Sequence, residues 1–248
     1  MSPRTKEQNE EIRLRRLAQI RKAAADVFLN KGPLLEIRDV AVQAGLGYGT
    51  VYHYYSNKGD LLNDLLWDAL ERAGGWPETP LETPLEVLGA STSDEVLKRG
   101  DLGLAAEADS RNSAAADFQS ESRVTTAAAE LGPVAAAGVR LLQLWAEDHA
   151  LYLLHKLAGE GFAALPEGRS APLSAAYRRE VLAPLAVLLE TERAVDGVAA
   201  SGENAANSPH QLQRAEMLLA ALVGCASLSL RRGKLHEEAR DIVQFLKL

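Results

Sequence analysis

The stretch that most constrains the fold covers residues 36–62, with the sequence EIRDVAVQAGLGYGTVYHYYSNKGDLL. Its first part carries apolar residues at helical spacing, which predicts a short helix: Ile37, Val40 and Ala41. Gly45 and Gly47 then mark a turn, because glycine tolerates the positive φ that a sharp turn can require. A second short helical run follows over residues 48–55. Two short helices joined by such a turn predict a helix-turn-helix, whose second helix enters the major groove of DNA.

The second helix of this motif divides into a buried and an exposed side. Val51 and Tyr55 are four residues apart and are expected to face the core. The remaining side chains are rich in rings and hydroxyl groups, which can bond phosphate oxygens or contact bases: Tyr48, Thr50, Tyr52, His53 and Tyr54. Lys58 begins the next helix, where its ammonium group and the helix amides can meet the same phosphate. A solvated surface histidine is the alternative for His53.

The order and spacing of these residues resemble the signature of the TetR family of bacterial transcriptional regulators. That signature reads approximately Ala-Gly-Val-Ser-x-Gly-Thr-Leu-Tyr-x-His-Phe-x-Ser-Lys-Glu-x-Leu. The matching positions, with Val51 and Tyr55 as close substitutes, are Gly45, Gly49, Thr50, Tyr52, Lys58 and Leu61. The resemblance covers about residues 10–70 and adds Gly49 to the expected DNA contacts. It implies a dimeric DNA-binding regulator, most often a repressor.

Three residues depart from the family signature. Glu36 stands where the first helix of the motif usually has a Thr or Ser cap, and Tyr54 replaces the usual His. Gly47 replaces the Ser that usually caps the recognition helix. Glycine is an acceptable N-cap, so this change costs only a few tenths of a kcal/mol, but it removes a hydroxyl that could reach a phosphate.

Composition favours helices and a reducing compartment. Aromatic residues make up only 5% of the 248 residues, and no alternating strand pattern is present. A single cysteine, Cys225, excludes an intrachain disulfide and indicates a cytoplasmic protein. The N-terminus lacks the apolar core of a signal peptide, and no apolar run approaches 18 residues. We therefore expect an all-α, cytoplasmic chain.

The net charge of −7 is unevenly distributed. Residues 1–64 contain 10 Lys and Arg against 8 Asp and Glu, whereas residues 77–133 contain 4 against 11. A local basic surface can still meet phosphates, because charges act only within a Debye length of about 10 Å. The predicted first helix, residues 12–30, offers five basic residues that either contact phosphate or form a solvated face: Arg13, Arg15, Arg16, Arg21 and Lys22.

Four segments are expected along the chain. Residues 1–57 form the helix-turn-helix DNA-binding domain, and residues 58–76 form a connecting helix. Residues 77–132 are an acidic insertion rich in Ala, Ser and Pro, interpreted as a flexible loop with short helices, as a lid over a ligand pocket or as a cap on the dimer. Residues 133–248 form a helical ligand-binding and dimerisation domain.

The C-terminal segment is expected to hold a small molecule and a second copy of the chain. Long helices are predicted over residues 133–159, 175–193 and 211–231, with a break or kink at Pro184. Candidate pocket-lining residues, for which plain core packing is the alternative, are Trp145, His149, Tyr152, Phe162 and Tyr177. The resemblance implies that the last two helices pair with those of a partner, through Val181, Leu185, Leu188, Leu218, Leu222, Gly224, Cys225 and Leu228.

The sequence thus predicts a homodimeric regulator on a palindromic operator, modulated by an unidentified small-molecule ligand. No catalytic group or cofactor is expected, because no paired carboxylates, activated nucleophile or phosphate loop stands out. No metal is expected either, since His149 and His155 are six residues apart without a metal-binding pattern. The alternative function is a regulator-like protein without DNA binding that acts as a ligand carrier or protein partner.

Overall fold

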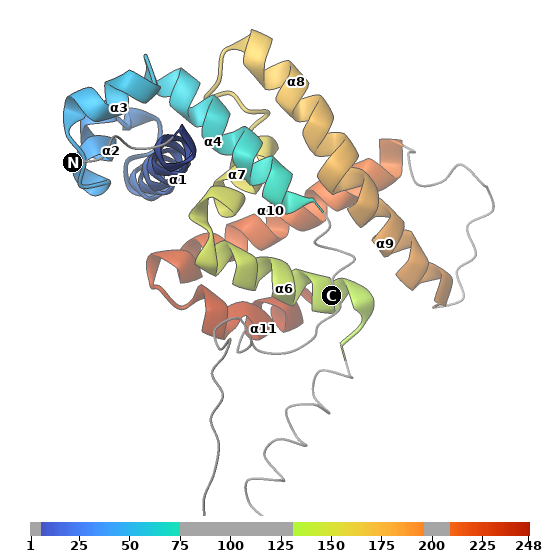
Figure 1. Cartoon of the computed structure of the whole chain (residues 1–248). Coiled ribbons are helices and arrows are strands. Elements are labelled where there is room, and N and C mark those ends of the chain that lie inside the picture. Colours follow the sequence, from blue (N-terminus) through green and yellow to red (C-terminus); the bar gives the residue numbers. More distant parts are fainter. Residues whose placement is uncertain (1–5, 75–130, 196–208) are drawn as a thin grey trace, which may run out of the picture. The chain divides into compact units, whose positions relative to one another are not determined.

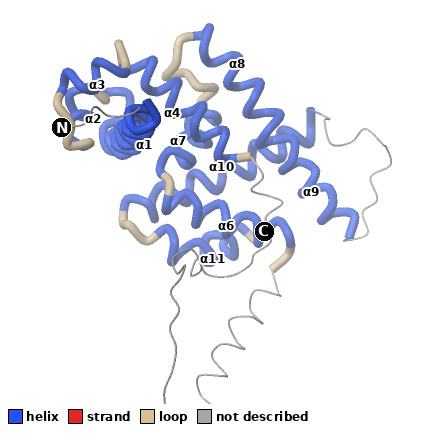
Figure 2. Tube along the Cα trace, viewed as in Figure 1, coloured by secondary structure: helices blue, strands red, loops and turns tan. Residues whose placement is uncertain are grey.

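The computed structural model describes residues 6–74, 131–195 and 209–248. All of these except Leu131 belong to one compact unit formed by residues 1–79 and 132–248. Every regular element in these ranges is a helix, as Figures 1 and 2 show, and the all-α fold class is confirmed for this part of the chain. The predicted acidic insertion lies almost entirely outside the described residues.

The first helix, α1 (Lys6–Lys31), begins six residues before the predicted start. Residues 6–11 are therefore helical as well. Ion pairs at helical spacing join Glu10 to Arg13 and Glu11 to Arg15, both at 2.9 Å, and support this first part of the helix. The helix ends where Gly32 takes a φ of +57° and a short helix, η1 (Gly32–Leu34), follows.

The predicted helix-turn-helix consists of α2 (Ile37–Gln43) and α3 (Tyr48–Tyr54). Gly45 adopts a φ of +63° in the turn between them, which glycine does without the steric cost of a Cβ. The connecting helix α4 (Lys58–Ala73) begins behind Asn57, whose side-chain oxygen accepts from the Asp60 amide at 2.9 Å. Its predicted apolar stripe is buried: Leu61, Leu62, Leu65, Leu66 and Leu70.

The single helix expected over residues 133–159 is divided into α6 (Pro133–Glu147) and α7 (His149–Gly159). Asp148 separates them with an extended backbone, at φ −124° and ψ 97°. Its carboxylate accepts from the Ala150 amide at 2.9 Å and so caps the start of α7. The prediction of one long helix is wrong because a capping aspartate offers the backbone amides a partner outside the helix.

The next helices, α8 (Glu167–Tyr177), η2 (Arg178–Leu182) and α9 (Ala183–Val195), follow one another without an intervening loop. The helix predicted to begin at residue 175 therefore begins earlier, at Glu167. The η2 segment has π-helical geometry and lies directly before Pro184. Proline has no amide hydrogen for the preceding turn, and a wider turn accommodates that loss. The predicted irregularity at Pro184 is thus present as η2.

Two helices complete the described chain, α10 (Pro209–Arg231) and α11 (Leu235–Leu246). Figure 1 shows α11 beside α6, in agreement with their extensive contact. The core under α1, α4, α6 and α7 is closely packed, and its side chains are at most 1% exposed at Ile20, Leu65, Leu66, Trp145 and Leu153. This shared core positions the helix-turn-helix beside the C-terminal helices.

The turn glycine should be needed for stability, whereas the glycine of the recognition helix should not. Gly45→Ala forces a Cβ into the left-handed region and should lower the free energy of unfolding by about 1–2 kcal/mol. Gly49→Ala is the matched control, since Gly49 lies within α3, has ordinary φ and has open space where a Cβ would be. That variant should be neutral or stabilising by up to about 1 kcal/mol. Urea unfolding of both variants would measure this, and equal losses would contradict it.

Candidate functional sites

The recognition helix α3 buries one side and exposes the other. Val51 is fully buried and Tyr55 is 5% exposed, so both face the core as predicted. The opposite side carries exposed residues, namely Tyr48, Gly49, Thr50, Tyr52 and His53, while Tyr54 is half-buried. All the predicted contact residues of α3 therefore lie on or beside one accessible surface. That this surface binds DNA stays a prediction.

Two tyrosines form the centre of this surface. The rings of Tyr48 and Tyr52 lie 4.5 Å apart, centre to centre, one helical turn from each other. The hydrogen bond between their hydroxyl groups raises the pKa of Tyr52 above its usual value, so the Tyr52 phenol is neutral at pH 7. A neutral phenol both donates and accepts hydrogen bonds, which suits phosphate oxygens and base edges. Next to them, the rings of His53 and Tyr54 meet edge to face at 5.4 Å.

Lys58 has a partner within the chain. Its ammonium group donates to the carbonyl oxygen of Pro33 at 2.9 Å and so ties the start of α4 to η1. The lysine nevertheless remains exposed, and an ammonium group has three donors. The predicted phosphate contact is thus compatible with this bond.

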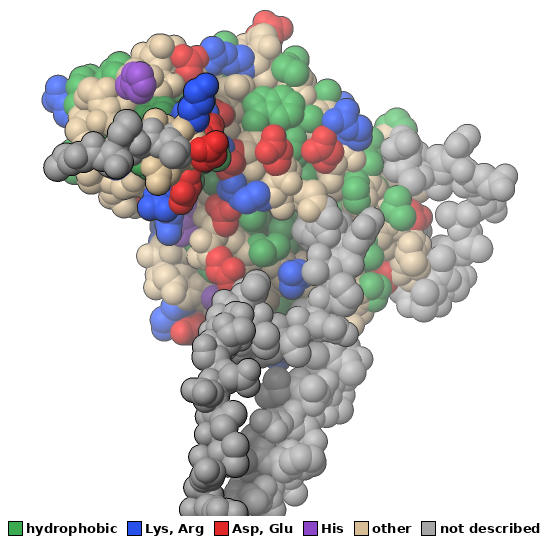
Figure 3. Space-filling model, viewed as in Figure 1, with side chains coloured by type: hydrophobic (Ala, Val, Ile, Leu, Met, Phe, Trp, Pro, Cys, Tyr) green, Lys and Arg blue, Asp and Glu red, His purple; other side chains and the backbone are tan. Residues whose placement is uncertain are grey.

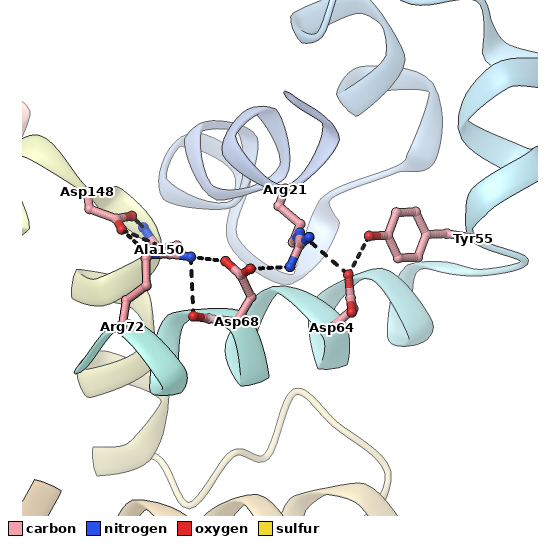
Figure 4. Close-up of polar contacts among 7 residues, drawn as sticks. All are labelled: Arg21, Tyr55, Asp64, Asp68, Arg72, Asp148 and Ala150. Atoms are coloured by element: carbon pink, nitrogen blue, oxygen red, sulfur yellow. Dashed lines mark hydrogen bonds and ion pairs between the residues drawn. The ribbon is translucent and has the colours of Figure 1, made fainter. Parts of the chain in front are cut away.

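A chain of charged side chains leads from the end of α3 to the start of α7 (Figure 4). The Tyr55 hydroxyl donates to Asp64 at 2.5 Å, and Asp64 lies 3.6 Å from the guanidinium group of Arg21. Arg21 also pairs with Asp68 of α4. Burial and the neighbouring carboxylate of Asp64 raise the pKa of Tyr55, so its hydroxyl stays protonated and keeps donating.

The same chain continues through Arg72. Arg72 pairs with Asp68 and, through Nε at 2.9 Å, with Asp148, the residue that caps α7. A second contact between the N-terminal and C-terminal helices joins His149 Nδ1 of α7 to Asp26 Oδ1 of α1 at 2.6 Å. Basic and acidic side chains accordingly lie close together on the face shown in Figure 3. The helix-turn-helix and the C-terminal helices are thus linked by ion pairs as well as by the core.

A cavity of about 800 Å³ lies among α7, α8 and α10. Three of the five predicted ligand residues line it, namely Tyr152, Phe162 and Tyr177. Trp145 is fully buried and packs behind it, with its ring 5.8 Å from that of Tyr152. His149 does not belong to this cavity, because it is directed toward Asp26 on α1. A ligand role for any of these residues stays a prediction.

The residue that the sequence reasoning missed is His155, which lines the cavity and is 3% exposed. Its Nδ1 lies 2.7 Å from the carbonyl oxygen of Leu151, one turn earlier in α7. Burial lowers the pKa of His155 to about 4, so the imidazole is neutral at pH 7. A histidine on an otherwise apolar helix, among Leu151, Leu153, Leu154 and Leu157, was the available signal.

The residues predicted for a partner interface divide into a buried set and an accessible set. Val181, Leu185 and Leu222 are at most 1% exposed in the single chain. They therefore pack in its own core, and their assignment to the interface is corrected. The other five are accessible, with Leu228 65% exposed and Leu188, Leu218, Gly224 and Cys225 at least partly so. Met217, at 66% exposed, and Val187, at 47%, add apolar surface on α10 and α9 that the sequence reasoning did not select.

Within residues 6–74, 131–195 and 209–248, no group of three His, Cys, Asp or Glu side chains is arranged to hold a metal ion. In those same ranges, none of the helices combines the length and the apolar character needed to cross a bilayer.

Comparison with known proteins identifies the helix-turn-helix. Residues 20–65 match the model of a family described as bacterial regulatory proteins, tetR family. Among solved structures, the fatty acid degradation regulator FadR from Bacillus halodurans is 14% identical over 93% of this chain and 94% of its own, with a TM-score of 0.50. This likeness shows the fold.

Two further solved structures are similar at lower TM-scores. The transcriptional regulator FadR from Bacillus subtilis, in complex with stearoyl-CoA, is 16% identical over 92% of this chain and 96% of its own, with a TM-score of 0.46. Salmonella enterica GusR is 16% identical over 94% of this chain and 95% of its own, also with a TM-score of 0.46. A search of curated proteins by sequence found no match.

The buried neutral His155 should make stability depend on pH. An unfolded histidine has a pKa of about 6.5, so between pH 6.5 and 4 the unfolded chain binds a proton that the native chain does not. The contribution of neutral His155 to the free energy of unfolding should therefore be fully present above pH 6.5. It should fall by up to about 3 kcal/mol as the pH is lowered to 4. Urea unfolding at pH 7.5 and 4.5 would measure this in wild type and His155→Phe. The variant should lose less on acidification, and an equal loss would contradict the assignment.

Proposed function

We propose that this chain, which belongs to the tetR family of bacterial regulatory proteins through its helix-turn-helix domain, is a DNA-binding transcriptional regulator that acts as a repressor. The observation that carries the proposal is the division of α3 into a buried side, with Val51 and Tyr55, and an exposed side of rings and hydroxyls. A helix held in this way by the core can present a fixed set of side chains to a major groove.

The proposed regulator acts as a homodimer. Accessible apolar side chains on α9 and α10, among them Val187, Met217 and Leu228, support a partner surface there. Two copies related by two-fold symmetry present two recognition helices, which require half-sites about 34–36 Å apart, or a multiple of that, on a palindromic operator. The domain boundaries that go with this proposal are 1–57, 58–76, 77–132 and 133–248.

A small molecule in the cavity among α7, α8 and α10 is proposed to modulate DNA binding. The cavity volume of about 800 Å³ lies in the usual range for small-molecule sites. The helix α7, which lines this cavity, is capped at its start by Asp148, and Arg72 of α4 contacts Asp148. A ligand acts through this route only if it binds two arrangements of the helices with different affinities.

Removal of the tyrosine pair on α3 should weaken DNA binding without unfolding the protein. Tyr48→Ala/Tyr52→Ala deletes two exposed phenols, and we expect the affinity for DNA from upstream of the gene to fall at least about tenfold. Phe245→Ala on α11, which removes a ring that is 78% exposed, is the control and should leave binding unchanged. Fluorescence anisotropy at low salt would measure both affinities. An unchanged affinity in the double variant would overturn the proposed interface.

A further inference from the structure

His155, which lines the cavity, carries one hydrogen-bonding atom whose character the geometry fixes. His155 Nδ1 lies 2.7 Å from the Leu151 carbonyl oxygen, and a carbonyl oxygen can only accept. Nδ1 must therefore carry the ring hydrogen. In a neutral imidazole this leaves Nε2 as an acceptor with a free lone pair.

This acceptor has no partner within the described part of the chain. Nε2 is buried and makes no hydrogen bond with any described residue, while His155 itself lines the cavity. An unpaired buried acceptor costs free energy, and a group that donates to it recovers that cost. The cavity therefore favours a molecule that brings a donor to this point.

The surroundings of His155 are uncharged rings. The ring of Trp145 lies 5.0 Å away and that of Tyr177 5.7 Å away, centre to centre, and Phe162 meets Tyr177 at 6.0 Å. Burial raises the pKa values of Tyr177 and Tyr152, so these phenols are neutral at pH 7. A charged group packed against these rings would lose part of its hydration, which costs free energy.

Charged side chains also line the cavity. Three are basic and two are acidic: Lys156, Arg178, Arg231, Glu160 and Glu216. All five are exposed or half-exposed, whereas His155 is 3% exposed. A charge on a bound molecule is therefore best solvated beside these accessible side chains, and the neighbourhood of His155 is left for apolar and neutral groups.

We propose that the effector is an amphipathic molecule with an apolar body, whose buried end is a neutral hydrogen-bond donor such as a hydroxyl or N–H group that donates to His155 Nε2. This assignment rests on the proposed ligand-responsive function and gives its cavity a ligand class. A molecule whose buried end only accepts hydrogen bonds, such as an ether, an ester or a carboxylate, leaves Nε2 unpaired.

The test uses three probes with one apolar body: 4-octylphenol, its methyl ether 4-octylanisole, and 4-octylbenzoate. Calorimetric titration of the full chain at pH 7.5 should give at least about tenfold tighter binding for the phenol than for the ether. The ether is the more apolar molecule, so burial of apolar surface alone predicts the opposite order. Equal binding, or tighter binding of the ether or the benzoate, would overturn the proposal.

Two variants separate the role of Nε2 from general packing. His155→Phe keeps a ring of similar size without the acceptor, and the preference for phenol over ether should disappear. His149→Phe lies on the same helix but faces Asp26, so its preference should equal that of wild type. A preference that persists in His155→Phe would overturn the proposal. If His155→Phe does not fold, the ratio of the phenol and ether affinities in wild type decides by itself whether the proposal holds.

The outcomes also distinguish this inference from the function on which it rests. Probes that bind without the expected order overturn the donor assignment and leave the cavity as a ligand site. Failure of all three probes to bind wild type overturns both the ligand site and the donor assignment. DNA binding is measured separately by anisotropy and does not depend on either result.

Discussion

The burial of Val51 and Tyr55 is the constraint on which the rest of the structure depends. These two side chains, four residues apart, fix which side of a seven-residue helix meets the core and which side is left in solvent. A helix of that length is not stable alone, so its orientation comes from packing. The exposed pair, Tyr48 and Tyr52, has its position only because the opposite side is buried.

Tyr55 extends this constraint beyond the helix-turn-helix. Its hydroxyl begins the series of ion pairs through Arg21 and Arg72 that ends at Asp148. Partly buried pairs of this kind cost free energy to form but cost more when one partner is removed, so they favour one arrangement over looser ones. Asp148 begins α7, and α7 carries His155 into the cavity. One connected set of contacts therefore runs between the proposed DNA interface and the proposed ligand site.

The sequence predicted the helix-turn-helix well because its signals are local. The turn at Gly45 and the start of a helix at Lys58 depend on residues that are close in sequence, and the structure agrees with both predictions. The sequence does not predict the break at Asp148, because a single aspartate within an apolar helical pattern is equally compatible with one continuous helix. Periodicity also cannot say whether an apolar face meets its own chain or a partner, so Val181 was misassigned. His155 was passed over because its role depends on the rings around it, which lie far apart in sequence.

We propose that α3 is a recognition helix in a two-fold symmetric DNA-binding protein. Footprinting of the purified protein on DNA from upstream of its own gene, at two salt concentrations, tests this most directly. We expect a protected site with two-fold symmetry, half-sites about 34–36 Å apart or a multiple of that, and a steep loss of affinity as salt rises. Absent or salt-insensitive protection would contradict it and would favour a regulator-like protein that no longer binds DNA.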